Sequence, residues 1–278
     1  MRLKGIRRSS NIEDRRRSGG GGKASLGGVG LLIVLAIGYF AGVDVTPLLE
    51  SMPAQQQGDP RALSAEEQRA AEFSAQVLAT TEEVWGQLFP EQLGRSYAAP
   101  VLVLFSGQTE SPCGGASGAT GPFYCPADRK AYLDTEFFAT LSQQLGAKGD
   151  FAAAYVIAHE VAHHVQNELG ILGQVNEARQ AAGEAQGNAL TVRLELQADC
   201  LAGVWATHVD GLLEPGDLDE ALTAARMIGD DHLQRRAGRV PQPHTFRHGT
   251  SEQRESWFAR GYESGEVGVC DTFSARQL

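Results

Sequence analysis

The segment that most constrains the fold is residues 157–166, IAHEVAHHVQ, because it spaces two histidines and a glutamate as H-E-x-x-H. Residues four apart on an α-helix lie on the same face, one turn from each other. A helix here would direct the imidazoles of His159 and His163 at one metal ion. Glu160 would then reach a water at that metal and act as the general base. The segment therefore predicts a helix with a metal-dependent hydrolytic site.

A second segment, residues 195–199 with the sequence ELQAD, carries two carboxylates four residues apart. Hydrolytic zinc sites use three protein ligands and leave the fourth position to water. We expect Glu195 to be the third ligand and Asp199 to accept the ring N–H of a ligating histidine. A solvated helix face is the alternative. Ligation is favoured because the flanking residues are mostly apolar, and a buried carboxylate is costly unless it is paired or metal-bound.

Two residues near the C-terminal end are candidates for stabilising a tetrahedral oxyanion, which needs a donor opposite the metal. His248, in the sequence RHGTS, is the candidate catalytic residue for this role, and Arg254 is an oxyanion or substrate candidate. A surface or core histidine without a catalytic role is the alternative for His248, and the sequence leaves both open. That alternative is favoured for four other histidines: His164, His208, His232 and His244.

An uncharged stretch, LGGVGLLIVLAIGYFAGV, begins at Leu26 and is just long enough for a helix that spans a bilayer. Residues 1–23 carry eight basic and two acidic side chains. The positive-inside rule then predicts one crossing of a bacterial cell membrane at residues 26–45, with the N-terminus cytoplasmic and the catalytic domain outside. A buried core helix and a cleaved signal peptide are the alternatives. The basic segment and the lack of a clear cleavage site favour an anchor.

The charge of the rest of the chain is strongly acidic. Outside residues 1–23 it carries 32 acidic side chains and 16 basic ones, whereas the whole chain has a formal net charge of −10. Nucleic-acid binding requires a basic face for the phosphates, so we exclude nucleic acid as a partner. Repulsion by this surface also disfavours acidic substrates.

Four cysteines permit two disulfides in three possible pairings, and the sequence does not choose among them. Cys113 and Cys125 lie in a loop rich in glycine and proline whose ends a disulfide could join. Cys200 and Cys270 would then form the second pair. A cysteine metal site is the alternative, but no C-x-x-C spacing occurs. Disulfides are favoured, and they agree with an oxidising compartment.

Hydrophobic spacing and turn residues predict a mixture of helices and short strands. Ser64 and Glu67 form a capping-box pattern that starts a helix, and Pro90 is expected to close it near residue 88. Residues 170–187 are expected to be a mobile connection or a short helix. The other expected elements are strands at 101–105 and 123–133, the latter as a strand or hairpin, and helices at 135–145, 151–169, 188–208, 217–236 and 251–261.

Several motifs occur together in one order: GPFYCPADRKAYLD, HEVAHHVQ, ELQADCLAGVW, IGDDHLQ and FRHGTSEQR. Over about residues 98–273 they resemble the bacterial neutral zinc metallopeptidases of the YpfJ type. More broadly, H-E-x-x-H followed by E-x-x-A-D is similar to the gluzincin metallopeptidases. The resemblance implies that Glu195 is the third zinc ligand and that Asp199 supports the site. It also implies an α+β, predominantly helical zincin fold with a small sheet, whose active cleft lies beside an edge strand at residues 123–132.

We therefore predict a basic cytoplasmic tail at 1–25, a transmembrane helix at 26–45, a linker at 46–63 and a zinc metallopeptidase domain at 64–278. One Zn²⁺ per chain would activate a water for hydrolysis of peptide or protein substrates, with Glu160 as general base. The alternative is a catalytically weak or inactive, metal-stabilised domain that binds a partner in the cell envelope. The enzyme is favoured because every expected catalytic position holds a competent residue.

Overall fold

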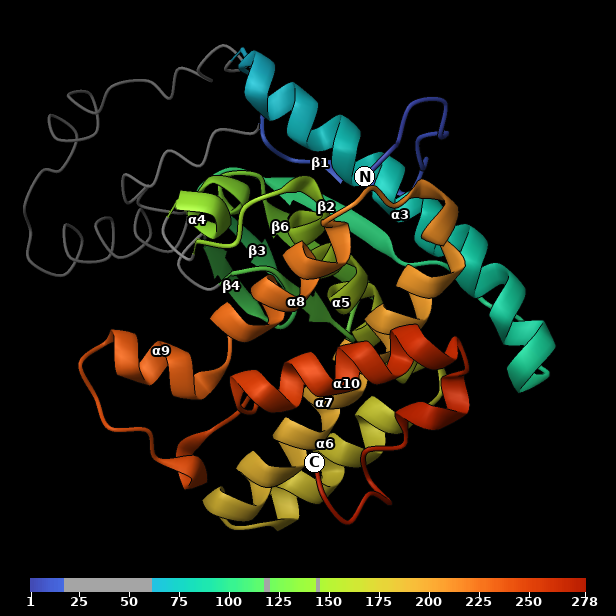
Figure 1. The fold of residues 1–278 in the computed structure, drawn as a ribbon. Helices are drawn as coiled ribbons and strands as arrows, with labels where there is room; N and C mark the ends of the chain where they lie inside the picture. The colour runs from blue at the N-terminus through green and yellow to red at the C-terminus, as the bar shows by residue number, and fades with distance from the viewer. Residues whose placement is uncertain (18–61, 118–120, 144–145) are drawn as a thin grey trace, which may run out of the picture. The chain divides into compact units, whose positions relative to one another are not determined.

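The computed structural model describes residues 1–17, 62–117, 121–143 and 146–278 (Figure 1). The predicted transmembrane helix at 26–45 and most of the linker at 46–63 lie outside these residues. Within the part of the chain that is described, no helix is both long and apolar enough to cross a bilayer. The described residues form an α+β structure that is mostly helical and has a small sheet, as predicted.

A four-stranded sheet lies on one side of the domain. Its strand order is β1 (Ile12–Asp14), β2 (Val101–Phe105), β6 (Lys130–Asp134) and β5 (Phe123–Cys125). β1 and β6 both run parallel to β2, whereas β5 runs antiparallel to β6. β5 is therefore an edge strand, and β5–β6 is the hairpin expected at residues 123–133. A separate antiparallel hairpin, β3 (Gln108–Ser111) and β4 (Gly114–Ser117), was not predicted.

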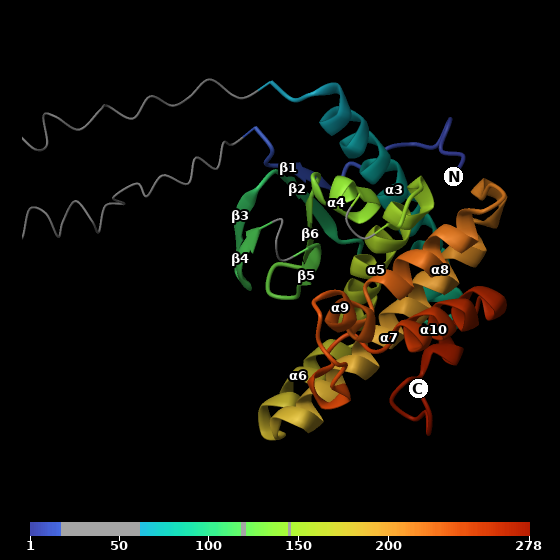
Figure 2. The same ribbon diagram turned by 60° about the vertical axis from the view of Figure 1, so that its left-hand side comes forward.

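The helices pack on the sheet in a second and a third layer, as both ribbon views show (Figures 1 and 2). α5 lies next to the sheet and contacts β5, β6 and α3, while α7 and α8 both contact α5 and α10 contacts both α7 and α8. α6 extends from the end of α5 along α7. The bounds are α3 (Ala65–Leu93), α4 (Phe137–Gln143), α5 (Asp150–Glu168), α6 (Ile171–Ala181), α7 (Glu184–His208), α8 (Asp217–Met227), α9 (Asp230–Arg236) and α10 (Ser251–Ser264).

α5 forms the centre of the core, and every residue from 151 to 166 is buried. Its neighbour α7 is in close contact with α10 because both helices have a glycine at the crossing. A Cβ on Gly203 would lie 2.1 Å from the carbonyl oxygen of Phe258, and one on Gly261 would lie 1.9 Å from that of Cys200. The two glycines let the backbones meet, and this contact places the first turns of α10 beside the acidic motif of α7.

Residues 1–15 belong to the same compact unit as residues 64–278, whereas a separate basic tail was predicted at 1–25. The segment Ile12–Asp14 adds β1 to the sheet beside β2. Arg7 pairs with Glu82 of α3 at 2.8 Å, and Lys130 of β6 pairs with Glu13 at 2.6 Å. The basic side chains of this segment therefore serve in part as ion-pair partners of the domain, a role that a count of charges does not reveal.

Two helix boundaries differ from the prediction. α3 starts with the expected capping box at Ser64 but continues through Pro90 to Leu93. A proline in the last turn removes only one backbone donor, so the helix can continue past it. Gly94 then ends the helix with a left-handed cap. The single helix expected at 217–236 is divided into α8 and α9 at Gly229. A Cβ on Gly229 would lie 2.5 Å from the backbone nitrogen of Ser251, so the chain bends where it meets α10.

Candidate metal centre

Two buried helices bring the three predicted metal ligands together. α5 supplies His159 and His163 from consecutive turns, and the neighbouring α7 supplies Glu195. His159 Nε2 lies 3.2 Å from Glu195 Oε2, and His163 Nε2 lies 3.5 Å from Glu195 Oε1. One ligand atom from each residue lies within 4.8 Å of the other two. Two imidazole nitrogens and a carboxylate oxygen at this separation can hold one ion.

The electrostatics of these residues favour a cation between them. Burial alone would raise the pKa of Glu195, but His163 and His159 hold that pKa well below its ordinary value. Burial alone would lower the pKa of His159, yet Asp199 and Glu195 raise it to about 10. Positive charge beside Glu195 is thus stabilised, whether protons on the rings or a metal ion carry it. This donor set and charge fit a divalent metal.

His159 is oriented by an ionic cluster on the side away from Glu195. Its Nδ1 lies 2.9 Å from Asp199 Oδ1, so the ring N–H donates to that carboxylate and Nε2 faces the other ligands. Arg254 of α10 binds both oxygens of Asp199, from Nε and Nη2, at 2.9 Å each. The hydroxyl of Tyr155 also donates to Asp199 Oδ1. Asp199 is fully buried, and the charges of Arg254 and His159 offset its burial and lower its pKa.

His163 is oriented by a chain of neutral groups. Its Nδ1–H donates to Gln166 Oε1 at 2.8 Å, and Gln166 Nε2 donates to Gln197 Oε1 at 3.1 Å and to the carbonyl of Leu194 at 2.7 Å. Gln197 Nε2 donates in turn to the carbonyl of Cys270 at 3.0 Å. This chain connects a candidate ligand to the C-terminal segment. Sequence analysis missed both glutamines, although Gln166 lies one turn after His163 in the same motif.

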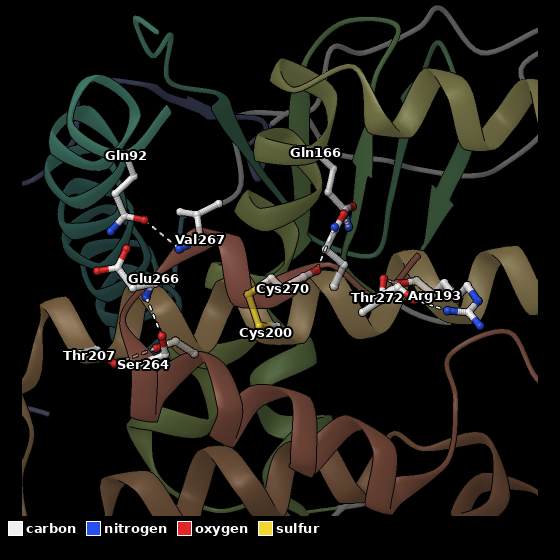
Figure 3. The surroundings of a disulfide bond; sticks show 12 residues. Gln92, Gln166, Arg193, Cys200, Thr207, Ser264, Glu266, Val267, Cys270 and Thr272 are labelled. Atoms are coloured by element: carbon white, nitrogen blue, oxygen red, sulfur yellow. Dashed lines mark hydrogen bonds between the residues drawn. A yellow bond between two sulfur atoms is a disulfide. The ribbon is translucent and has the colours of Figure 1, made fainter. Parts of the chain in front are cut away.

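The Cys200–Cys270 disulfide fixes the far end of that chain, and Figure 3 shows it joining α7 to the C-terminal segment. On either side of the disulfide, the Val267 N–H donates to Gln92 Oε1 at 2.8 Å and the Thr272 hydroxyl donates to the carbonyl of Arg193 at 2.6 Å. The other disulfide joins Cys113 to Cys125. The sequence predicted disulfides without choosing among the three pairings, and the structure has this one.

Glu160 lies beside the ligands and has an unused acceptor. It is 9 % exposed, and its Oε2 atom is buried without a hydrogen-bond partner among the described residues. Burial raises the pKa of Glu160, although His163 and His159 oppose this increase. A buried carboxylate oxygen without a donor is costly, which indicates that a group absent from the protein itself, such as a water, completes the site.

A cleft of about 480 Å³ opens over these residues. The edge strand β5 contributes Phe123 and Tyr124 to its lining, and α6, α7 and α9 contribute further lining residues. His159, Glu160, His163 and Glu195 all line the cleft. The predicted arrangement, with an edge strand beside the H-E-x-x-H helix, is therefore present.

His164 connects the edge strand to α5 and does not face the metal ligands. Its Nε2–H donates to the carbonyl of Ala98 at 2.6 Å, which leaves Nδ1 to accept the hydroxyl proton of Tyr124 at 3.0 Å. The ring also makes edge contacts with Tyr97 and Tyr124. His164 is fully buried, and this burial lowers its pKa. A surface or core position without a catalytic role is the prediction for this histidine, and its contacts join β5 to α5.

His248 lies in the loop before α10, where it lines the cleft and is half-exposed. Its Nδ1 is 3.1 Å from Asp230 Oδ1, and Asp230 Oδ2 accepts the backbone N–H groups of Arg247, His248 and Gly249. Asp230 thus holds both the loop and the ring, so that Nε2 is left for a ligand in the cleft. When the ring is protonated, this nitrogen is a donor.

Arg254, predicted as an oxyanion or substrate group, lines the cleft, but its guanidinium is engaged within the protein. The residue is 1 % exposed and its guanidinium is occupied by Asp199 and Tyr155. Thr250 and Gln253 form the capping box that starts α10, and Arg254 in the first turn of this helix points inward toward Asp199 of α7. The T-x-x-Q pattern in the sequence was the available signal.

Comparison with known proteins found a family model and relatives that match the chain. A family model described as "Putative neutral zinc metallopeptidase" matches residues 1–273. The uncharacterized protein YpfJ of Escherichia coli strain K12 is 50% identical over 288 residues, covering 98% of this chain and 99% of that protein. The uncharacterized protein Rv2575 of Mycobacterium tuberculosis strain H37Rv is 45% identical over 212 residues, covering 72% of this chain and 69% of the relative. No solved structure matches the chain.

Proposed function

Because the chain belongs to the neutral zinc metallopeptidase family, we propose that it hydrolyses peptide bonds with one bound Zn²⁺. The observation that carries the proposal is the convergence of His159, His163 and Glu195 beside the unpartnered carboxylate oxygen of Glu160. Two imidazoles and one carboxylate form a ligand set of hydrolytic zinc sites, and the glutamate adjacent to the first histidine favours hydrolysis over the iron chemistry that shares these ligands.

We assign the metal to the Nε2 atoms of His159 and His163 and to the carboxylate of Glu195. Both Nδ1 atoms already donate hydrogen bonds, to Asp199 and Gln166, so the tautomers leave Nε2 available. When bound there, zinc would acidify a water and polarise the scissile carbonyl.

The side chains around the metal centre supply the proton transfers. Glu160 would take a proton from the attacking water through its free oxygen and return it to the leaving amine. Its raised pKa suits a group that must both accept and release a proton. His248, oriented by Asp230, would donate a hydrogen bond from Nε2 to the oxyanion that develops on the carbonyl.

The edge strand β5 offers a way to hold an extended substrate. Its backbone pairs with β6 on one side, and its residues Phe123 and Tyr124 line the cleft. A peptide that adds to this edge would be held by main-chain hydrogen bonds, which do not depend on its sequence. The hydrogen bond between Tyr124 and His164 would set the position of such a peptide relative to Glu160.

We also propose that residues 26–45 attach the protein to a bilayer, on the basis of their apolar composition. The two disulfides support an oxidising compartment for the domain. The packing of residues 1–15 against the domain sets a condition, since both must face the same compartment in the folded protein. The predicted single crossing with a cytoplasmic N-terminus would require the N-terminal segment to separate from the domain.

Labelling of intact cells tests the location. Single cysteines would replace Arg8 and Arg236, and a membrane-impermeant maleimide would be added from outside the inner membrane. We expect both positions to be labelled to the same extent. Labelling at position 236 alone would show that the N-terminal segment lies in the cytoplasm and is separated from the domain.

The experiment that tests the activity compares the zinc-loaded full chain with its Glu160→Gln variant on a mixed peptide library, with cleavage read by mass spectrometry. We expect cleavage by the native chain and a decrease of about 10²–10⁴-fold in the variant, because the general base is lost. Zinc content should stay the same, since Glu160 is not a proposed ligand. No cleavage by the zinc-loaded native chain, or equal cleavage by both proteins, would contradict the proposal.

A further inference from the structure

We propose that the α6 end of the cleft binds a carboxylate of the substrate through Arg179 and Arg247. The inference rests on the proposed peptidase function and names a class of substrate for it. These are peptides whose acidic group lies in the α6 end of the cleft when the scissile bond is at the metal centre. Arg179 lines the cleft, and both arginines line a polar hollow of about 460 Å³ that adjoins the cleft.

A stripe of side chains on α6 leads from the metal centre to Arg179. Leu172, Asn176 and Arg179 all line the cleft, and their spacing of four and three residues places them on one helix face. Leu172 packs with Leu194, the residue before Glu195, so the stripe starts beside the metal centre. Arg179 lies two turns further along, about 10 Å from Leu172, which is the length of about three residues of an extended peptide.

The two arginines have unused hydrogen-bond donors. Within the described residues, the only polar contact of the Arg179 side chain is a 3.5 Å hydrogen bond to Asn176 Oδ1, and neither arginine pairs with a carboxylate. Glu184 is the acidic residue that lines the hollow, and it makes no ion pair with either of them. By contrast, the guanidinium of Arg254, which also lines the cleft, is engaged by Asp199 and Tyr155. Of the two described arginines that line the cleft, Arg179 is therefore the one whose guanidinium is available to a ligand.

The positive charge of this hollow is opposite to the acidic surface expected from the composition of the chain. The chain outside residues 1–23 is strongly acidic, which disfavoured acidic substrates. The hollow nevertheless presents two arginines to one glutamate, and Arg236 and Arg239 lie in the adjoining segment without a carboxylate partner among the described residues. A guanidinium binds a carboxylate through two parallel hydrogen bonds, which gives geometric selection as well as attraction. The acidic remainder would keep such a ligand away from other surfaces.

The carboxylate can come from the C-terminus of a peptide or from an internal Asp or Glu side chain. The test uses fluorescent peptides of one sequence in four forms, with Glu or Gln at the third position after the intended scissile bond and with a free or amidated C-terminus. Affinity is measured by fluorescence anisotropy on the zinc-loaded full chain carrying Glu160→Gln, which slows turnover.

We expect a carboxylate form to bind about five- to tenfold more tightly than the fully neutral form, and we expect this preference to weaken as salt is raised. Adding Arg179→Gln and Arg247→Gln together should remove the preference. The matched control is Arg235→Gln, because Arg235 is an exposed arginine of α9 that pairs with Asp231 at 2.8 Å and does not line the cleft. It should leave the preference unchanged.

The peptide forms separate the two sources. A preference that follows the free terminus identifies a terminal carboxylate, and one that follows Glu in amidated peptides identifies a side chain. Equal binding of all forms, no binding of any form, or a preference that survives the double variant would overturn the inference. Cleavage without any acidic preference would overturn the carboxylate site but leave the peptidase proposal intact. Carboxylate-dependent binding without cleavage by the native chain would support the carboxylate site but contradict the peptidase proposal.

Discussion

The two candidate ligand histidines lie one turn apart on α5 and are held in different ways. His159 donates to an ionised carboxylate, Asp199, whose charge is balanced by Arg254. His163 donates to a neutral amide, Gln166, which leads through Gln197 to the backbone of Cys270. The ionic support brings a buried charge that must stay paired, and the neutral support connects the ligand to a covalent crosslink.

This difference indicates separate tasks for the two supports. An ionised acceptor makes the ring that donates to it more basic and a stronger metal ligand, whereas an amide mainly fixes its orientation. Asp199 is accordingly a main cause of the raised pKa of His159, while the raised pKa of His163 comes mainly from Glu195. Substitutions on the two sides should therefore have different consequences for stability and for metal binding.

The largest effect is expected on the ionic side. Asp199→Ala removes the partner of a buried guanidinium, and breaking a buried ion pair in this way costs about 3–5 kcal/mol. Urea unfolding of the metal-free full chain measures this loss. A second variant, Asp199→Ala with Arg254→Met, removes both charges and should recover part of the stability. If Asp199→Ala alone were as stable as the native chain, the ionic cluster would not contribute as described.

The Cys200–Cys270 crosslink tests the end of the neutral support. This disulfide joins residues 70 positions apart, so its loss should lower the free energy of unfolding by roughly 4 kcal/mol through chain entropy. We expect zinc affinity to fall as well, because the carbonyl of Cys270 that accepts from Gln197 would no longer be fixed. The matched control is Cys113→Ser with Cys125→Ser. That pair closes a separation of 12 residues, worth about 3 kcal/mol, and has no connection to His163. An equal loss of zinc affinity in both double variants would contradict the connection through Gln197.

Gln166→Leu tests the middle of that support. It leaves the Nδ1–H of His163 without an acceptor and should cost about 1–3 kcal/mol. Zinc affinity should fall about 10–100-fold, as is usual when the hydrogen-bond partner of a metal-binding histidine is lost. Competition with a chromogenic chelator gives the affinity. Gln87→Leu, an exposed change on α3, is the control and should alter neither quantity. An unchanged affinity in Gln166→Leu would show that His163 needs no orienting partner.

A third histidine, His164, provides the smallest contrast, because it is held on both nitrogens without facing the ligands. Tyr124→Phe removes one of its hydrogen bonds and should cost about 1 kcal/mol without changing zinc affinity. If the proposed activity holds, KM for extended peptides should rise more than kcat falls, since β5 would be less well positioned. A fall in zinc content would place His164 among the determinants of the metal centre.

The two helices that bear the candidate ligands could be predicted from sequence, because on each helix the relevant side chains lie about one turn apart. The spacing of His159 and His163, and the carboxylate pair in an apolar helix, already define a shared face. Gln166 and Gln197 could not be recognised in this way, because their roles depend on how α5 and α7 pack. Glutamine is also common on helices, so it gives no signal of its own.

The N-terminal strand shows why pairing between distant segments is harder to predict. β1 has three residues, Ile12–Asp14, of which two are acidic, and its partner β2 starts at Val101. Strand formation of this kind depends on the neighbours rather than on the segment itself. The basic residues around it were assigned to a tail by charge alone, although Arg7 pairs with Glu82 in the domain. An experiment on the isolated domain should therefore retain residues 1–17.

The most direct test of the metal centre is the zinc content of the purified full chain and of its Glu195→Ala variant, measured by mass spectrometry of the metal after dialysis. We predict about one zinc per native chain and a large loss in the variant, because a hydrolytic zinc site needs all three protein ligands. Circular dichroism would show that the variant remains folded. A native chain without zinc, or a folded variant with undiminished zinc, would contradict the assignment of His159, His163 and Glu195.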